Sequence, residues 1–432
     1  MTDREKEIIG LINREVKPAL GCTEPIAVAL AVAKAVEILE DEVEFDRLST
    51  DFRIRAAVSG NILKNGMGVG VPGTGMTGLH IAAALGAVCG KSEYGLEVLH
   101  DLDDRAVARA RGIVSDDLVE ISIADTSHKL YVSATVSADG KSANAVIADS
   151  HENIVRTMLG DKVISDTEHS GCGSLEEFTD YGITIKEILE FAEKAAPEDI
   201  SFILDDRKLN LALAKEGLHS CYGLCVGRTI MRDREKIFGD SFLTYAMALT
   251  AAASDARMAG CTLPAMSNSG SGNQGITVSM PVIAYAEHYG IDDERLSRAL
   301  IISNLTAIHI KHYLGPLSAL CGCVVASTGA ACGITWLKGG NYWQVCATIK
   351  NMIGNITGMV CDGAKVGCAM KVASGVSSAI QSSMLALDNH FAGKHDGIID
   401  SDIEHTIENL GRIGSVGMEQ TDEVILDIML NK

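Results

Sequence analysis

The sequence is poor in aromatic residues and proline, and it has no excess of basic charge. Aromatic residues make up 4% of the 432 positions, and only 7 residues are proline. Lysine and arginine number 37 against 57 aspartate and glutamate residues, so the formal net charge at pH 7 is −20. A broad basic surface for nucleic acid or an anionic membrane would have to overcome this negative charge. We therefore predict that the protein binds neither nucleic acid nor a membrane.

The sequence also lacks a CxxC pair and an apolar run near its start. Without CxxC, a zinc ribbon or a thioredoxin-type site is disfavoured. The first ten residues, MTDREKEIIG, do not resemble an export signal. We therefore expect a cytoplasmic location, where structural disulfides are rare. The 12 cysteines need another explanation, and we interpret most of them as small packing residues.

One uncharged run, residues 313–337, is long enough to suggest a membrane-spanning helix. It contains Pro316, several glycines and small polar residues, and its neighbours are amphipathic. These features favour a buried helix within a bundle that is rich in small residues. A helix that is apolar on all sides is expected in such a core.

Hydrophobic periodicity separates an α/β part from a helical part. Alternating apolar residues over 52–58, 119–123 and 130–136 predict half-buried strands. Residues 138–141 (ADGK) predict a hairpin turn. Beyond residue 183 the pattern is helical almost throughout, and these helices carry many small side chains.

We predict an α+β fold, with a large, mostly all-helical catalytic domain and a smaller α/β domain. A loop over residues 165–180 is the expected boundary. The predicted division is N-terminal helices over 1–40 that pack with the catalytic domain, the α/β domain over 41–180, and the helical catalytic domain over 181–432.

Residues 61–78 (NILKNGMGVGVPGTGMTG) form a glycine-rich segment between a predicted strand and a predicted helix. The segment contains GxGxxG in the outline of a dinucleotide fingerprint, although Pro72 lies inside it. Exposed N–H groups before a helix suit an anion. We interpret the segment as a cradle for a substrate carboxylate, with a tight structural turn or a nucleotide site as alternatives. Asn61, Asn65 and Thr74 are candidate substrate-binding residues, and Lys64 is a candidate catalytic residue.

A second polar segment, residues 267–275 (SNSGSGNQG), lies within an uncharged stretch. Amides and hydroxyls between buried helices need a ligand or other polar partners. Ser271, Asn273 and Gln274 are therefore candidate substrate-binding residues. The segment also looks like the carboxylate loop of one class of pyridoxal-phosphate enzymes, an alternative that would make Lys236 the Schiff-base lysine.

Four further motifs contain cysteine or glycine: PALGCTEP at 18–25, PGTG at 72–75, LSALCGC at 317–323 and CDGAKVGCAMK at 361–371. Together they resemble the L-cysteine desulfidase family, which is related to the alpha chain of iron–sulfur L-serine dehydratases. The resemblance covers essentially the whole chain. GCTEP paired with CDGAKxGCAxK is its most specific part.

The resemblance implies a 4Fe-4S cluster held by three cysteines, with the fourth iron open to substrate. Soft thiolates suit such a cluster. Matched to the family's motifs, the ligands are Cys22, Cys321 and Cys361, with Cys323 and Cys368 as alternates. His80 lies where the dehydratases have a histidine after a GTG segment, so it is a second candidate catalytic residue.

The function implied is β-elimination of L-cysteine to pyruvate, ammonia and sulfide without pyridoxal phosphate. One alternative is dehydration of L-serine, or of another β-substituted amino acid, at the same cluster. Another is a module that binds an amino acid or nucleotide without chemistry. A small amino acid is the expected partner, and we expect a homodimer.

Overall fold

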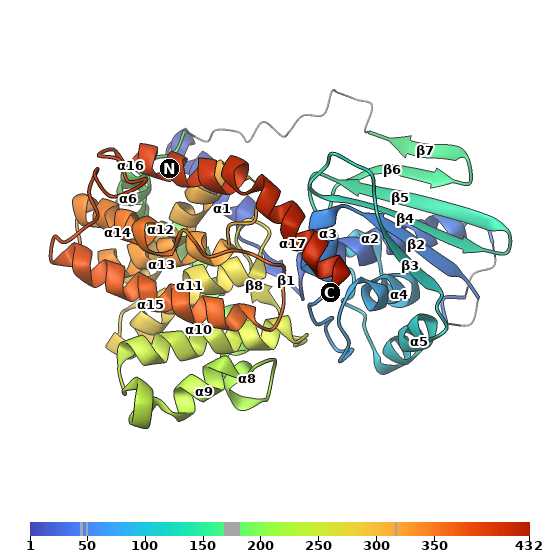
Figure 1. Cartoon of the computed structure of the whole chain (residues 1–432), viewed down its shortest axis with the longest axis horizontal. Helices are drawn as coiled ribbons and strands as arrows, with labels where there is room; N and C mark the ends of the chain where they lie inside the picture. Colours follow the sequence, from blue (N-terminus) through green and yellow to red (C-terminus); the bar gives the residue numbers. More distant parts are fainter. Residues whose placement is uncertain (44–45, 49–50, 168–181, 316–317) are drawn as a thin grey trace.

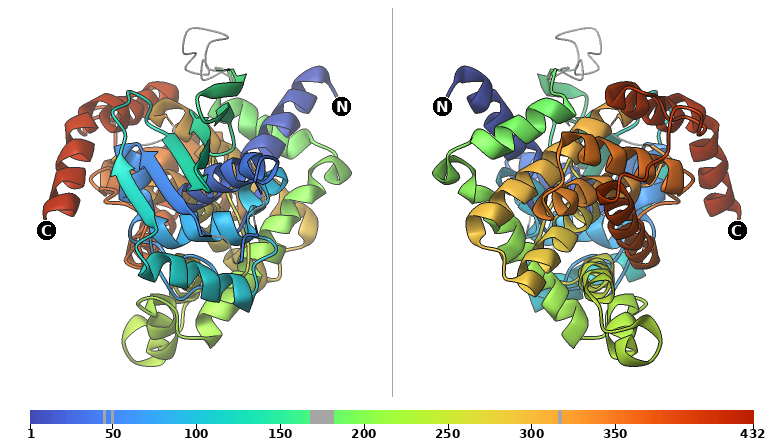
Figure 2. Two further views of the ribbon diagram at one scale, coloured as in Figure 1. Left: turned by 90° about the vertical axis from the view of Figure 1, so that its right-hand side faces the viewer. Right: turned by 90° about the vertical axis from the view of Figure 1, so that its left-hand side faces the viewer.

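The computed structural model describes residues 1–432 except 44–45, 49–50, 168–181 and 316–317. A large helical body lies at one end of the molecule and a sheet with its covering helices lies at the other (Figure 1). Viewed along the long axis, the sheet lies in front of the helical body (Figure 2, left). The predicted α+β fold with a mostly helical body is confirmed.

In the described part of the chain, six strands form one mixed sheet with the order β3-β2-β4-β5-β6-β7. β2 and β3 pair in parallel, and the other neighbouring strands of this order pair antiparallel. The β4–β5 turn has positive φ at Asp139 and Gly140, as the ADGK segment predicts. The strands are β2 (Arg53–Val58), β3 (Val119–Ile123), β4 (Tyr131–Ala138), β5 (Lys141–Ala148), β6 (Ile154–Leu159) and β7 (Lys162–Asp166).

The sheet packs against α2 (Thr23–Glu40), which itself packs against α4 (Leu79–Cys89). Both helices are almost entirely buried. The division predicted for residues 1–40 therefore needs a correction, because only α1 (Asp3–Glu15) packs into the core of the helical body. The apolar and small residues of α2 lie in the core beneath the sheet instead. Two short helices complete this part, α3 (Gly60–Gly66) and α5 (Asp104–Ser115), with a 3-10 turn over Ser92–Glu97.

The helical body is built around α13 (Gly322–Leu337), which contacts α11, α12, α14 and α15. Gly329 and Gly333 let neighbouring backbones approach, since a Cβ at Gly329 would lie 2.3 Å from the Ser303 carbonyl oxygen. The other helices are α6 (Ile185–Lys194), α7 (Pro197–Ile200), α8 (Asp205–His219), α9 (Val226–Arg232), α10 (Phe242–Met258), α11 (Gly272–Tyr289), α12 (Asp293–Leu314), α14 (Tyr342–Ile356), α15 (Cys368–Leu387), α16 (Ile403–Arg412) and α17 (Glu419–Asn431).

The uncharged run 313–337 forms the end of α12 and the central helix α13. Within the described residues, no helix has the length and apolar character needed to cross a membrane. The predicted boundary loop at 165–180 lies mostly outside the described residues.

Two contacts join the ends of the chain to distant segments. The short strand β1 (Pro18–Ala19) pairs with β8 (Ala265–Met266) just before α11. At the other end, α17 leaves the helical body and lies against α3 (Figure 1). The segments that carry the sequence motifs therefore meet where the two parts of the molecule join.

The α2–α4 packing gives a first prediction. A Cβ at Gly86 would lie 2.3 Å from the carbonyl oxygen of Ala29, so Gly86→Ala should force the helices apart and cost about 1–3 kcal/mol of unfolding free energy. The matched control is Gly112→Ala in α5, where an added Cβ would meet no neighbouring atom within 4 Å. This variant should gain about 0.5–1 kcal/mol of unfolding free energy. Urea unfolding measures both; equal effects would contradict the close packing.

Candidate active site

Cys22 lies at the turn before α2 and is buried. Its thiol donates to Oε2 of Glu24 at 2.9 Å, and the Asn65 side-chain amide donates to Oε1 of the same carboxylate at 2.9 Å. Burial raises the pKa of Cys22, and the negative charge of Glu24 adds to this shift. The GCTEP motif therefore holds a protonated thiol against a buried carboxylate.

Cys321 and Cys361 lie on two short antiparallel segments. The N–H of Cys321 donates to the Met359 carbonyl at 3.0 Å, and the N–H of Cys361 donates to the Ala319 carbonyl at 2.6 Å. A hydrogen bond from the Cys321 thiol lowers the pKa of Cys361, and the charge of Lys64 acts in the same direction. The same contact raises the pKa of Cys321. The pair therefore favours a thiolate at Cys361.

Cys22 packs in one small apolar cluster with Val366 and Cys368, so residues from opposite ends of the chain do meet. The alternate candidates are nearby: Cys368 begins α15, and the Cys323 thiol donates to the Lys371 carbonyl at 3.2 Å. The described residues contain no group of three His, Cys, Asp or Glu side chains arranged to hold a metal ion. The ligand assignment therefore stays a prediction.

Most other described cysteines are packing residues. Cys261, Cys332 and Cys346 are buried and Cys89 is half-buried. The exposed Cys221 differs, because its sulfur lies 2.8 Å from that of Cys225. Cys172 lies outside the described residues.

Several N–H groups of the glycine-rich segment already have acceptors within the protein. Gly70 donates to the Met258 carbonyl at 2.9 Å, and Gly73 donates to that of Gly260 at 3.2 Å. The Thr74 hydroxyl donates to the Val71 carbonyl within the turn. In addition, α3 separates the glycines from β2, unlike in a dinucleotide fingerprint. These contacts favour the alternative of a tight structural turn, while a binding role for Thr74 stays a prediction.

The two predicted catalytic residues lie in different surroundings. Lys64 is 2% exposed and forms an ion pair with Asp422 of α17, while its charge also acts on Cys361. His80 is exposed on the first turn of α4, and its side chain makes no hydrogen bond or ion pair in the described structure. Asn61 lines a cavity of about 240 Å³ beside Lys64 and α17.

The segment 267–275 forms a turn and the start of α11. Ser269 and Gly270 both have positive φ, and the Ser271 hydroxyl caps the helix by accepting from the N–H of Gln274. Gln274 donates to Asn268 at 2.9 Å, and Oδ1 of Asn273 lies 3.4 Å from the Ser254 hydroxyl. The polar side chains of this segment thus hold one another in a defined arrangement. Lys236, required by the pyridoxal alternative, is exposed in a separate turn at Arg234–Phe238.

Three further residues of this region were missed by the sequence analysis. Burial lowers the pKa of Lys311 to about 8, although the negative charges of Cys361 and Glu24 oppose the shift. His151 follows β5 and lies beside Gly270, and burial lowers its pKa. Arg257, near the end of α10, is 4% exposed and donates to the Gly21 carbonyl. The only sign of these three residues in the sequence is their position next to uncharged segments.

Several buried polar atoms in this region have no hydrogen-bond partner in the described structure. They include Oδ1 of Asn65, Nε2 of His151 and Nε of Arg257. Such atoms are rare in folded proteins, because each costs free energy unless a partner arrives. Their presence around Cys22 and α11 is typical of a site that binds a polar ligand.

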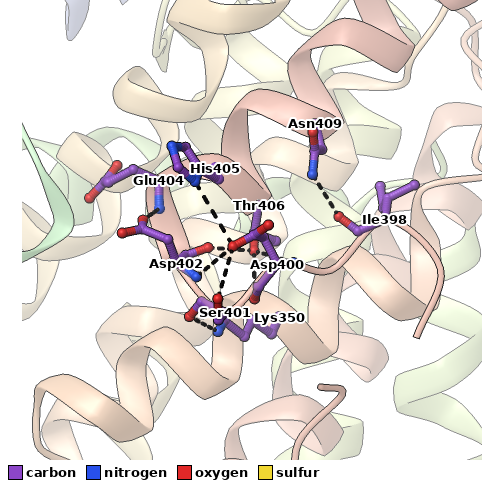
Figure 3. Close-up of polar contacts among 9 residues, drawn as sticks. All are labelled: Lys350, Ile398, Asp400, Ser401, Asp402, Glu404, His405, Thr406 and Asn409. Carbon is purple, nitrogen blue, oxygen red and sulfur yellow. Dashed lines mark hydrogen bonds and ion pairs between the residues drawn. The ribbon is translucent and has the colours of Figure 1, made fainter. Parts of the chain in front are cut away.

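A larger cavity, of about 850 Å³, is lined by residues of α14 and of the start of α16. The buried Lys350 ammonium donates to the Ser401 carbonyl at 2.7 Å (Figure 3). Oδ1 of Asp400 accepts from the N–H of Asp402 at 2.8 Å, and the Thr406 hydroxyl lies in the same network. We interpret this network as the structural cap of α16.

The buried Asp255 of α10 gives a prediction about pH. Burial raises its pKa to about 6, although its Oδ2 accepts from the N–H of Gly227. The folded protein therefore binds this proton more tightly than the unfolded chain, and stability falls as pH rises from about 4 to about 6. Asp255→Asn has no such proton to lose, so its stability should not show this fall. The difference in unfolding free energy, variant minus wild type, should therefore increase by about 1–3 kcal/mol between pH 4 and pH 7.

Urea unfolding at the two pH values measures the Asp255 effect. Asp161→Asn changes an exposed carboxylate in the turn between β6 and β7 and serves as the control. A difference between Asp255→Asn and wild type that does not vary with pH would contradict the assignment.

Comparison with known proteins adds a family relationship to this geometry. A family model described as serine dehydratase alpha chain matches residues 93–427. A UPF0597 protein of Bacteroides fragilis is 49% identical over the full length of both chains. One from Oleidesulfovibrio alaskensis is 52% identical over 98% of this chain and 97% of its own length. The family model spans Cys321 and Cys361 but begins after Cys22 and the glycine-rich segment.

Proposed function

This chain belongs to the serine dehydratase alpha chain family, and on that premise we propose that it is an iron–sulfur L-cysteine desulfidase. The proposed reaction converts L-cysteine and water to pyruvate, ammonia and sulfide without pyridoxal phosphate. The observation that carries the proposal is the Cys321–Cys361 pair, in which the charges of Lys64 and Lys371 favour a thiolate at Cys361. A dehydratase-like elimination is what the family supports; the sulfur substrate is our inference.

The donor set fits an iron–sulfur cluster in its chemistry. Cys321 and Cys361 are adjacent soft donors, and thiolates are the ligands that such clusters take. Cys22 is the third donor that would hold the cluster, since its side chain packs against the 364–368 segment that follows Cys361. When bound, the cluster would supply an open Lewis-acidic iron that stabilises the leaving sulfur.

The remaining steps fall to the protein's own side chains. Elimination breaks the Cα–H and Cβ–S bonds while the electron pair of the first forms the Cα–Cβ double bond, so a base must take the α-proton. Lys311 suits this role, because its pKa of about 8 makes the neutral amine accessible and its charge is coupled to Glu24 and Cys361. The buried surroundings of Cys22 limit access of water to the reacting groups.

Dehydration of L-serine at the same site is the second candidate function, and the family match supports it directly. The two substrates differ in the leaving atom, and sulfur binds iron more readily than a hydroxyl does. Parallel assays of the anaerobically reconstituted protein with L-cysteine and L-serine, following pyruvate and sulfide, distinguish them. Much faster turnover of serine would overturn the desulfidase proposal. Bound pyridoxal without acid-labile sulfide would also contradict the proposed iron–sulfur cluster.

A cysteine variant gives the third prediction. Cys361→Ala should abolish cluster assembly, so the protein should lose the iron and acid-labile sulfide, about four of each per chain, that the wild type binds. Pyruvate formation from L-cysteine should also fall to background. Iron and sulfide analysis after anaerobic reconstitution measures the first effect.

The matched control is Cys332→Ala, because Cys332 is buried in α13 and is not one of the proposed ligands. This variant should keep the cluster and its turnover. Wild-type activity in Cys361→Ala would contradict the assignment of Cys361 to the site. Ligand binding by Cys361→Ala, together with a wild type that neither binds iron nor turns over substrate, would favour the non-catalytic module.

A further inference from the structure

We propose that Arg257 and the first turn of α11 form the binding site for the α-carboxylate of the substrate. This inference rests on the proposed function only in taking the substrate to be an amino acid. It replaces the glycine-rich segment 61–78 as the place where the carboxylate binds.

Arg257 is a buried cation whose charge has no partner of opposite sign. Arg257 is 4% exposed. Its Nη2 donates to the Gly21 carbonyl at 2.8 Å, and its Nε has no acceptor among the described residues. No carboxylate forms an ion pair with it among the residues that the structure describes. Burying a charge without a counter-ion is costly, so this position is explained if an anion from outside the chain completes it.

The start of α11 faces this guanidinium. A Cβ at Gly272, the first residue of α11, would lie 2.2 Å from the Nε of Arg257. The backbone of the turn therefore lies directly against the cation, and only glycine leaves room for it. A side chain here would displace Arg257.

The first turn of α11 also has N–H groups to offer. The Ser271 hydroxyl accepts from the N–H of Gln274, whereas the N–H groups of Gly272 and Asn273 have no acceptor in the described structure. Free amides at the positive end of a helix dipole bind anions, and carboxylates in particular pair with arginine. The 18-residue α11 and the buried Arg257 thus point to the same ligand chemistry.

Acceptors for the substrate ammonium lie close to the same place. The charge of Arg257 acts on Cys22, whose thiol donates to Glu24. The Asn65 side chain donates to this carboxylate and keeps an unpartnered Oδ1. An anion-binding cation and two acceptors near Cys22 match the two charged groups of an α-amino acid.

Lys64, the cation predicted from the sequence, is less suited to the carboxylate. Its ammonium is already paired with the Asp422 carboxylate of α17, and the N–H groups of Gly70 and Gly73 have protein acceptors. A substrate carboxylate at Lys64 would have to displace Asp422. At Arg257 it would displace no carboxylate in the described part of the chain.

The fourth prediction compares Arg257→Gln and Arg257→Lys with the wild type. L-Alanine, which has the same α-carbon groups but no leaving group, is the probe, and L-alaninamide lacks only the carboxylate charge. Calorimetric titration of the full chain, with and without anaerobic reconstitution, should show that the wild type binds L-alanine and not the amide. Arg257→Gln should bind L-alanine about 100-fold more weakly, and Arg257→Lys should lie between them.

A matched control is Arg298→Gln, because the Arg298 guanidinium is paired with Glu294 and with backbone carbonyls at the end of α6. Its L-alanine affinity should equal that of the wild type. Urea unfolding separates binding from structure: losing an uncompensated buried charge should leave the stability of Arg257→Gln unchanged or higher. A large loss of stability would instead assign Arg257 a structural role and overturn the proposal.

Equal affinity of the wild type for L-alanine and its amide, or wild-type affinity in Arg257→Gln, would also overturn it. These outcomes test the carboxylate site and leave the proposed function to be tested separately. Pyruvate formation with an unchanged KM in Arg257→Gln would reject the carboxylate site and keep the desulfidase. Arg257-dependent binding of L-alanine without any turnover of L-cysteine would keep the site and reject the desulfidase.

Discussion

The candidate site depends on close backbone contact between the two parts of the molecule. A Cβ at Gly70 would lie 2.5 Å from the carbonyl carbon of Ala259, and one at Gly363 would lie 2.2 Å from the carbonyl oxygen of Lys64. These approaches bring the glycine-rich segment against the end of α10 and against the CDG motif. Because Gly21 also lies against Pro72, the GCTEP turn is held at the same junction.

This arrangement explains why the charged side chains of the site come from distant segments. Lys64 follows β2, Lys311 ends α12, and Arg257 ends α10. Each is placed by a well-packed helix whose small residues allow close packing, so the shortage of aromatic residues fits the architecture. The resulting interior has a low dielectric constant, in which each buried charge acts strongly on its neighbours. The lowered pKa values of Cys361 and Lys311 are two consequences.

Features set by local pattern could be predicted from the sequence. Apolar alternation located β2, the ADGK turn located the β4–β5 hairpin, and the absence of charge located the central helix α13. Roles that depend on a distant partner could not. The acceptors of the Gly70 and Gly73 amides are the carbonyls of Met258 and Gly260, at and just beyond the end of α10, and nothing in the segment's own sequence indicates them. The pairing of Lys64 with Asp422 joins residues 358 positions apart.

The role of Arg257 also could not be predicted from the sequence. In the sequence it is one charge near the end of a helix, where a cation is ordinarily stabilised by the helix dipole and solvated. In the structure it is buried, faces the start of α11, and has no counter-ion among the described residues. A protein core retains an unpaired charge and unpartnered amides only where surrounding packing is strong enough to offset their cost. The small-residue helices that fix this junction meet that condition, so the same packing that defines the fold also keeps polar groups available for a ligand.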